Sequence, residues 1–219
     1  MKFFLDTADV KAIQKWAETG LVDGVTTNPT HLSKEGGDPK KKIKEIISIL
    51  PKGDISVEVT EQKPEAVYKQ ARAIAKISKN ISVKIPCHSD YYPVIGKLAK
   101  EGISVNVTLV FTVIQAAMMA RLGVHYVSPF IGRLEDIDVD GMQLLPEMRE
   151  IFDLYGFKTE ILAASLRSVP HVHDAMLAGA DVLTLPISLF EKMVQNPLTD
   201  RGIEMFNADW KKLGVKQFP

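Results

Sequence analysis

The sequence contains very little cysteine, since Cys87 is the only one among 219 residues. A single thiol cannot form an intrachain disulfide, and it cannot supply the several thiolates of a structural zinc site. An excess of charge of either sign is also missing, because Lys and Arg total 27 and Asp and Glu total 27. A surface that binds nucleic acid or an anionic membrane needs a basic excess, so this balance argues against both partners.

Long apolar runs are absent as well, and no stretch approaches the roughly 18 consecutive apolar residues of a membrane span. The chain begins with a short apolar run that meets Asp6 too early for the core of a signal peptide. With 46% hydrophobic and 25% charged residues, the composition is that of a globular protein with enough apolar material for a core. We therefore expect a cytoplasmic enzyme or binding protein.

Short, β-branched apolar runs alternate along the chain with segments of helical periodicity. The runs predicted to be strands are 3–5, 24–26, 55–59, 82–85, 104–109, 126–129, 160–163 and 182–185. Between them, apolar residues recur at the spacing of one helix face, as in Ile43, Ile46, Ile47 and Leu50. Four glycines stand just before strands, where the C-cap of a preceding helix belongs, namely Gly102, Gly123, Gly156 and Gly179.

Alternation of strands and helices implies a parallel sheet, because parallel neighbours need a crossover connection. Eight such units predict an α/β fold of the (β/α)8 TIM-barrel class, with residues 1–219 as a single domain near the lower size limit of that fold. An open doubly wound sheet is the alternative, but no G-x-G-x-x-G turn follows the first expected strand.

A helical segment remains after the eighth expected strand. Ile203, Phe206 and Trp210 form an apolar stripe there, so we expect residues 200–219 to be an additional C-terminal helical extension. Such a helix must pack on its own barrel or on a neighbouring copy. Assembly into a homo-oligomer through this helix is therefore a hypothesis.

Seven of the eight expected strands carry polar side chains at or just beyond their C-terminal ends, which is where the chemistry of such a barrel lies. The candidates are Asp6, Asn28, Glu58, Lys84, Asn106, Thr108, Ser128, Arg133, Ser165 and Arg167. The eighth strand, which includes Thr184, is expected to contribute little. A purely structural role would not explain so many polar groups at one end of the strands.

Lys84 lies between Val83 and Ile85 in an apolar strand, so we expect its ammonium group to be largely buried. Burial disfavours the charged form of an amine, and a neutral amine is the nucleophile that attacks a carbonyl to form an imine. The alternative, typical of a lone lysine in a strand, is an ammonium group that reaches solvent or pairs with Glu58.

Asp6 and Glu58 are acids on separate strands that face one cavity, where a carboxylate can move protons to and from a hydroxyl. Asp6 could instead cap the first helix, or either acid could form a structural salt bridge with the lysine, but Asp9 competes for the cap. Asn28 and Asn106 carry amides that can recognise a polyol, although an Asn-Pro pair is also common in turns.

Ser165 and Arg167 follow the seventh expected strand and precede a helix. A hydroxyl, a guanidinium group and a helix N-terminus together make an anion site, and Arg133 could join them by a bidentate contact. Each arginine alone is more typical of a surface ion pair. Together these three residues predict a phosphorylated substrate.

No metal site is expected from the histidines. His171 and His173 are separated by one residue in an expected helix, so they point to different faces. His31, His88 and His125 form no metal-ligand pattern with them.

In this order, these residues resemble those of the transaldolase family, and the resemblance covers essentially the whole chain. The segments that carry it are FLDTA (4–8), GVTTNP (24–29), VEV (57–59), VKIP (83–86), NVTL (106–109), SPFIGR (128–133) and ASLR (164–167). In length the chain is similar to the short, single-barrel branch, which also contains the fructose-6-phosphate aldolases. Several motifs in register are far more specific than any one of them.

The resemblance implies a role for each site residue. Lys84 is similar to the lysine that forms an imine with a ketose donor, and Asp6 to the acid–base group that handles the C4 hydroxyl. Glu58 and Thr108 resemble the pair that holds a proton-relaying water. The residues implied to bind the dihydroxyacetone hydroxyls are Asn28, Asn106 and Ser128, and those implied to bind the phosphate are Arg133, Ser165 and Arg167.

The activity implied by the resemblance is transfer of a dihydroxyacetone unit from a ketose phosphate to an aldose phosphate in the pentose phosphate pathway. The donors would be sedoheptulose 7-phosphate or fructose 6-phosphate, and the acceptors erythrose 4-phosphate or glyceraldehyde 3-phosphate. No metal or organic cofactor is implied, because the protonated imine accepts the electrons. A pentamer or decamer is the implied assembly.

Fructose-6-phosphate aldolase, which releases free dihydroxyacetone, is the alternative within the family. That branch looks to have Gln at the position of Glu58 and Tyr at the position of Phe130. This chain is similar to the transferases at both positions, which favours transfer. Two other classes are a pyridoxal-phosphate enzyme, which also uses a buried lysine, and a non-catalytic sugar-phosphate binding barrel.

Overall fold

Eight parallel strands form a closed barrel in the computed structural model, which describes residues 1–214. Each strand pairs with the next one along the chain, and the last pairs with the first, so the sheet has no free edge. The strands are β1 Lys2–Asp6, β2 Gly24–Thr26, β3 Asp54–Glu58, β4 Ile81–Pro86, β5 Val105–Val110, β6 Tyr126–Pro129, β7 Glu160–Ala163 and β8 Val182–Leu185. The predicted (β/α)8 barrel is confirmed, and the open-sheet alternative is wrong.

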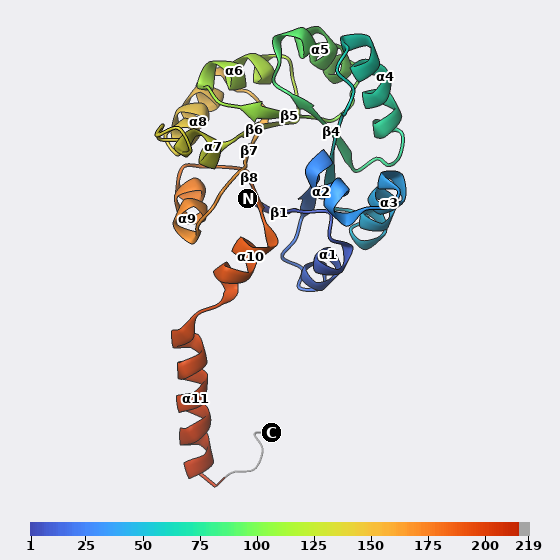
Figure 1. Cartoon of the computed structure of the whole chain (residues 1–219). Coiled ribbons are helices and arrows are strands. Elements are labelled where there is room, and N and C mark those ends of the chain that lie inside the picture. The colour runs from blue at the N-terminus through green and yellow to red at the C-terminus, as the bar shows by residue number, and fades with distance from the viewer. Residues whose placement is uncertain (215–219) are drawn as a thin grey trace.

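Helices surround the barrel and cover its outer face (Figure 1). The helices are α1 Val10–Ala17, α2 Pro29–Glu35, α3 Pro39–Ile49, α4 Pro64–Ala75, α5 Tyr92–Lys100, α6 Val113–Arg121, α7 Ile131–Glu135, α8 Leu144–Tyr155, α9 Val169–Leu177 and α10 Ile187–Val194, with a 3-10 turn η1 at Ser89–Tyr91; a last helix, α11 Pro197–Lys212, lies apart from the barrel. Their inner faces carry the predicted apolar periodicity: in α3, for example, Ile43 and Ile46 are buried, whereas Lys40 and Lys41 are exposed.

The predicted strand boundaries agree with the structure to within one residue at each end. The four glycines predicted to end helices all have positive φ, and Gly156 is the left-handed C-cap of α8, with φ 65° and ψ 30°. A glycine adopts this conformation without the steric cost that a Cβ would impose. Short glycine-ended turns are one reason that eight units fit into so short a chain.

Strand register brings distant parts of the sequence to one level of the barrel. Glu58 on β3 is the register partner of Lys84 on β4, and Lys84 is in turn the partner of Asn106 on β5. On the two strands that precede β3, Asp6 on β1 pairs with Thr26 on β2. Because neighbouring strands lie about 4.8 Å apart, residues in register can interact directly.

An apolar cluster fills the barrel below this polar level. Phe4, Tyr126 and Val182 are buried in it, and Leu162 and Ala164 form its upper part and also line the cavity above. The Phe4 and Tyr126 rings meet edge to face, with centroids 6.0 Å apart. This packed floor closes the lower end of the barrel, so polar ligands can enter only from the C-terminal ends of the strands.

Helix α11 extends away from the barrel as a separate arm (Figure 1). It begins at Pro197, slightly before the predicted start, and residues 215–219 of the predicted extension lie outside the described part of the chain. Its large apolar side chains are exposed, including Leu198 at 72% and Phe206 at 69%. Within residues 1–214, no helix is both long enough and apolar enough to cross a membrane.

Candidate active site

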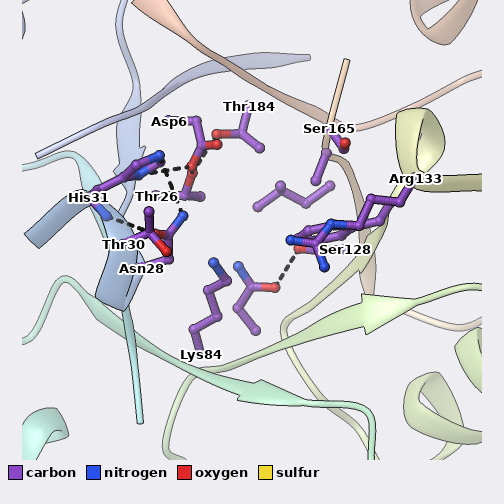
Figure 2. Close-up of a pocket in the computed structure, with 14 residues that line it drawn as sticks. Asp6, Thr26, Asn28, Thr30, His31, Lys84, Ser128, Arg133, Ser165 and Thr184 are labelled. Carbon is purple, nitrogen blue, oxygen red and sulfur yellow. Dashed lines mark hydrogen bonds and ion pairs between the residues drawn. The ribbon is translucent and has the colours of Figure 1, made fainter. Parts of the chain in front are cut away.

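A cavity of about 260 Å³ opens at the C-terminal ends of the strands, with Lys84 at its base (Figure 2). Eight of the predicted site residues line it, namely Asp6, Asn28, Lys84, Asn106, Ser128, Phe130, Arg133 and Ser165. In Figure 2, Asp6 and Asn28 lie on one side of the cavity, and Ser128 and Arg133 lie on the other. The barrel therefore brings together predicted residues from six strands and the segments that follow them.

Lys84 is 5% exposed, which confirms the burial expected from the apolar strand around it. Its Nζ lies 3.0 Å from Glu58 Oε2 and donates a hydrogen bond to the carbonyl oxygen of Thr27 at 3.2 Å. Lys84 is therefore both buried and paired with Glu58, the pairing that the sequence offered as an alternative. Because the two groups are in direct contact, a proton can pass between the amine and the carboxylate without any large movement.

Glu58 and Thr108 lie behind the cavity and are not part of its lining. Glu58 also borders a neighbouring, mostly apolar cavity of about 720 Å³ formed by α2, α3 and α4. Thr108 is 1% exposed, and its Oγ1 has no hydrogen-bond partner within the described residues. A buried hydroxyl normally has a partner, so this oxygen is available to a small polar molecule.

Three hydroxyl and carboxyl groups form a chain across β1, β2 and β8. Thr26 Oγ1 donates to Asp6 Oδ1 at 2.7 Å, and Thr26 Oγ1 and Thr184 Oγ1 are 2.5 Å apart. Asp9, rather than Asp6, caps α1, as the sequence suggested. The prediction that the eighth strand contributes little was wrong, because Thr184 lines the cavity and takes part in this chain.

The two asparagines are fixed in different ways. Ser128 Oγ donates to Asn106 Oδ1 at 2.6 Å, and Asn106 Nδ2 donates to Ser56 Oγ at 3.0 Å, so this buried amide has one defined orientation. Asn28 caps α2 through its Oδ1, which accepts the backbone N–H of His31 at 2.9 Å. Its turn role and its place in the cavity wall are thus compatible, because Nδ2 remains on the cavity side.

The predicted anion site is only partly assembled. Arg133 and Ser165 line the cavity, and the Arg133 guanidinium lies 5.1 Å from the centre of the Phe130 ring. Arg167 is not part of the lining, because both of its terminal nitrogens bind the Asp136 carboxylate. Hydrogen bonds from Arg167 lower the pKa of Asp136 below its usual range, so the pair stays charged.

The sequence did not identify four further polar residues of the cavity wall, Thr26, Thr30, His31 and Thr184. His31 had been considered only as a metal ligand. Its position three residues after Asn28, in the first turn of a helix that follows a strand end, was a usable signal. Within residues 1–214, no three His, Cys, Asp or Glu side chains are grouped so that they could hold a metal ion.

Residues 3–216 match the family described as Transaldolase/Fructose-6-phosphate aldolase. A probable transaldolase of Rhizobium meliloti (strain 1021) is 51% identical over 216 residues, which is 99% of both chains. A probable transaldolase of Lactiplantibacillus plantarum is 50% identical over 99% of this chain and 100% of its own. A third, from Streptococcus pyogenes serotype M2, is 52% identical over 96% of this chain and 98% of its own.

Among solved structures, flavocytochrome b2 with sulfite bound superposes with a TM-score of 0.60 at 14% sequence identity. The superposition covers 85% of this chain, which spans 56% of that one. At this level of identity the likeness shows the barrel fold alone.

Substituting Arg133 tests the anion site. Arg133→Ala should weaken binding of inorganic phosphate about tenfold or more, because a hydrogen-bonded contact between charged groups contributes about 1.5–3 kcal/mol. Asp136→Asn should strengthen binding, because it releases Arg167 toward the cavity. Isothermal titration at constant ionic strength measures both effects. Arg72→Ala, on the outer helix α4, is the matched control. Equal phosphate affinities for Arg133→Ala and the unmodified protein would contradict this interpretation of the site.

Proposed function

Because the chain belongs to the Transaldolase/Fructose-6-phosphate aldolase family, we propose that it is a transaldolase, which carries a dihydroxyacetone unit from a ketose phosphate to an aldose phosphate. The donor is sedoheptulose 7-phosphate or fructose 6-phosphate, and the acceptor is erythrose 4-phosphate or glyceraldehyde 3-phosphate. This chemistry belongs to the pentose phosphate pathway and to the cytoplasm, and one barrel domain is sufficient for it. The observation that carries the proposal is the buried contact between Lys84 and Glu58.

The reaction starts when Lys84 passes a proton to Glu58 and its free amine attacks the C2 carbonyl of the donor. The hydroxyl group of the resulting carbinolamine takes up a proton and leaves as water, which gives a protonated imine between Nζ and C2. The distance of 3.0 Å between Nζ and Glu58 Oε2 supports a direct transfer. A water molecule can also relay this proton, and the buried Thr108 hydroxyl can hold that water. The hydroxyl has no hydrogen-bond partner within residues 1–214.

Asp6 then accepts the proton of the C4 hydroxyl, and the bond between C3 and C4 breaks. Its electron pair moves into the imine and gives an enamine, while the aldose phosphate leaves with a new carbonyl group. In the second half-reaction, C3 of the enamine attacks the acceptor aldehyde, and the new alkoxide takes the proton back from Asp6. Asp6 suits both steps because it faces the cavity from the wall opposite Ser128 (Figure 2).

The cavity wall supplies hydrogen bonds for the dihydroxyacetone hydroxyls through Asn28, Asn106 and Ser128. Their amides and hydroxyl can each donate and accept, as alternating polyol oxygens require. The phosphate is held by Arg133 and Ser165, and Arg167 joins them when it leaves Asp136. Gly132 leaves room for Arg167 in its present position against Asp136, because a Cβ there would come within 2.5 Å of Arg167 Nε.

Transfer, rather than release of free dihydroxyacetone, is favoured by Glu58 and Phe130. Phe130 packs edge to face against Phe111, with ring centroids 6.2 Å apart, and it brings no phenol into the cavity. Without a hydroxyl at this position, no phenol assists water in attacking the protonated imine that forms when the enamine takes up a proton at C3. A non-catalytic binding barrel is disfavoured, because a buried ion pair such as that of Lys84 and Glu58 is often no more stable than an apolar pair of similar size.

Reductive trapping tests the proposal. Sodium borohydride added with fructose 6-phosphate should reduce the imine and leave a three-carbon adduct on one lysine, which peptide mass spectrometry locates at Lys84. Lys84→Met should abolish the adduct and the activity, whereas Lys100→Met, on the outer helix α5, should leave both unchanged. An adduct on another lysine, or none on active enzyme, would contradict the mechanism. A colourless purified protein would also exclude bound pyridoxal phosphate.

Helix α11 supports assembly into a homo-oligomer, for which the family resemblance implies a pentamer or decamer. Ile203, Met205 and Phe206 are 53%, 58% and 69% exposed. So much apolar surface on one helix that stands away from its own barrel is typical of a protein contact. The partner that suits it is a second copy of the chain, as in a symmetric homo-oligomer.

Sedimentation velocity tests this assembly. The unmodified protein should sediment as an oligomer, and Phe206→Asp should shift it toward the monomer, because a carboxylate cannot be buried in an apolar contact without a cost of several kcal/mol. Asn207→Asp introduces the same charge at a neighbouring exposed polar position and should leave the oligomer intact. A monomeric unmodified protein at micromolar concentration would refute the assembly and leave the reaction mechanism unaffected.

A further inference from the structure

His31 is a half-buried residue of the cavity wall for which the mechanism above has no role. It occupies the third position of α2, and its ring lies beside Asp6 (Figure 2). Its Nδ1 is 3.7 Å from Asp6 Oδ1, is shielded from solvent and has no hydrogen-bond partner within the described residues. A shielded ring nitrogen that faces a carboxylate is a feature that packing alone does not require.

The hydrogen bonds around Asn28 determine which ring nitrogen carries the proton. Asn28 Oδ1 accepts the backbone N–H of His31, so its Nδ2 is the group that approaches His31 Nε2, at 3.5 Å. Since Nδ2 is a donor, Nε2 accepts, and in the neutral ring the proton lies on Nδ1. The Nδ1–H bond therefore points toward the Asp6 carboxylate.

The charges around the ring favour this neutral form. Burial is the largest effect and lowers the pKa of His31 below its ordinary value of 6.5, while Asp6 on β1 opposes the shift. Lys84 on β4 and Lys34 on α2 lower the pKa further, and Glu58 on β3 raises it. His31 is therefore neutral at physiological pH and gains a proton only under more acidic conditions.

We propose that neutral His31 is a positioning residue, which orients Asp6 through Nδ1–H and Asn28 through Nε2, and that protonation of its ring stops carbon–carbon bond cleavage. Thr26 and His31 both approach Oδ1 of Asp6, and Oδ2 makes no hydrogen bond within residues 1–214. Oδ2 is thus the oxygen that takes the C4 hydroxyl proton. Closing the gap between Nδ1 and Oδ1 from 3.7 Å to hydrogen-bond length needs a shift of about 0.8 Å.

Protonation changes both contacts of the ring. The imidazolium binds Asp6 as an ion pair, which makes the carboxylate a weaker base for the C4 hydroxyl. Its Nε2 also becomes a donor and repels the Nδ2 group of Asn28, so the amide turns away from its position in the cavity wall. Imine formation at Lys84 does not use Asp6 Oδ2, so the ion pair at Asp6 should leave it unaffected. The turn of the Asn28 amide should weaken dihydroxyacetone binding, an effect that saturating dihydroxyacetone removes.

The test separates cleavage from imine formation, and it rests on the proposed function. Transfer from fructose 6-phosphate to erythrose 4-phosphate is measured between pH 5 and pH 9, and borohydride trapping at saturating dihydroxyacetone reports the imine alone. In the unmodified enzyme, kcat should fall at acidic pH as the His31 ring gains a proton. The fall should be centred below pH 6.5, because the pKa of His31 is lowered from that ordinary value. His31→Leu should lower kcat about tenfold at neutral pH, as expected for loss of one hydrogen bond to a charged group, and leave trapping unchanged.

His31→Asn is the decisive variant, because its amide can place a donor near the position of Nδ1 and has no ring to titrate. It should restore most of the kcat at neutral pH and extend activity to lower pH than in the unmodified enzyme. His173→Asn, at an exposed position of α9, is the matched control and should behave like the unmodified enzyme. Melting temperatures for all variants show whether each one folds.

Three results would overturn the role of His31. The first is that folded His31→Leu keeps the kcat of the unmodified enzyme and its decrease at acidic pH. The second is that kcat falls equally in His31→Asn and His31→Leu. The third is that the cleavage rate and the yield of trapped imine fall together. Each of these results is informative only if the unmodified enzyme transfers the dihydroxyacetone unit and forms the borohydride adduct. If the unmodified enzyme did neither, the proposed function itself would fail.

Discussion

The site depends on one costly contact, the ammonium group of Lys84 held inside the barrel against the Glu58 carboxylate. Removing two charges from water is unfavourable by several kcal/mol per ion, and their attraction offsets this only when the geometry is close. Here the pair is 3.0 Å apart and a backbone carbonyl accepts a further hydrogen bond from Nζ. An apolar pair would be equally compatible with the fold, so the contact is best explained by the proton transfer that imine chemistry needs.

Barrel closure makes this contact possible. Lys84 and Glu58 are register partners on adjacent strands, and the same register brings Asn106 to the other side of Lys84. The apolar floor beneath them excludes water from below, and the open end admits a phosphorylated sugar toward Arg133. One geometric constraint, the closed parallel sheet, thus positions the imine-forming amine, the acid–base groups and the anion site at once.

Much of this arrangement could be predicted from local sequence. Strand positions followed from apolar runs and glycine turns, and the burial of Lys84 followed from its two apolar neighbours. What could not be predicted depends on side-chain partners: the Arg167 guanidinium binds Asp136, and Thr184 completes a hydroxyl chain with Thr26. The role of the His31 ring likewise depends on which amide atom of Asn28 faces it. Such contacts join residues far apart in sequence or depend on rotamers, and neither periodicity nor spacing encodes them.

The fate of the enamine tests the account most directly. With fructose 6-phosphate as donor, the rate of transfer to erythrose 4-phosphate is compared with the rate at which free dihydroxyacetone appears when no acceptor is present. Because Phe130 brings no phenol to assist attack of water on the imine, transfer should exceed release by at least about tenfold, a difference of about 1.4 kcal/mol in barrier height. Release of dihydroxyacetone as fast as transfer would contradict the account and identify the enzyme as an aldolase.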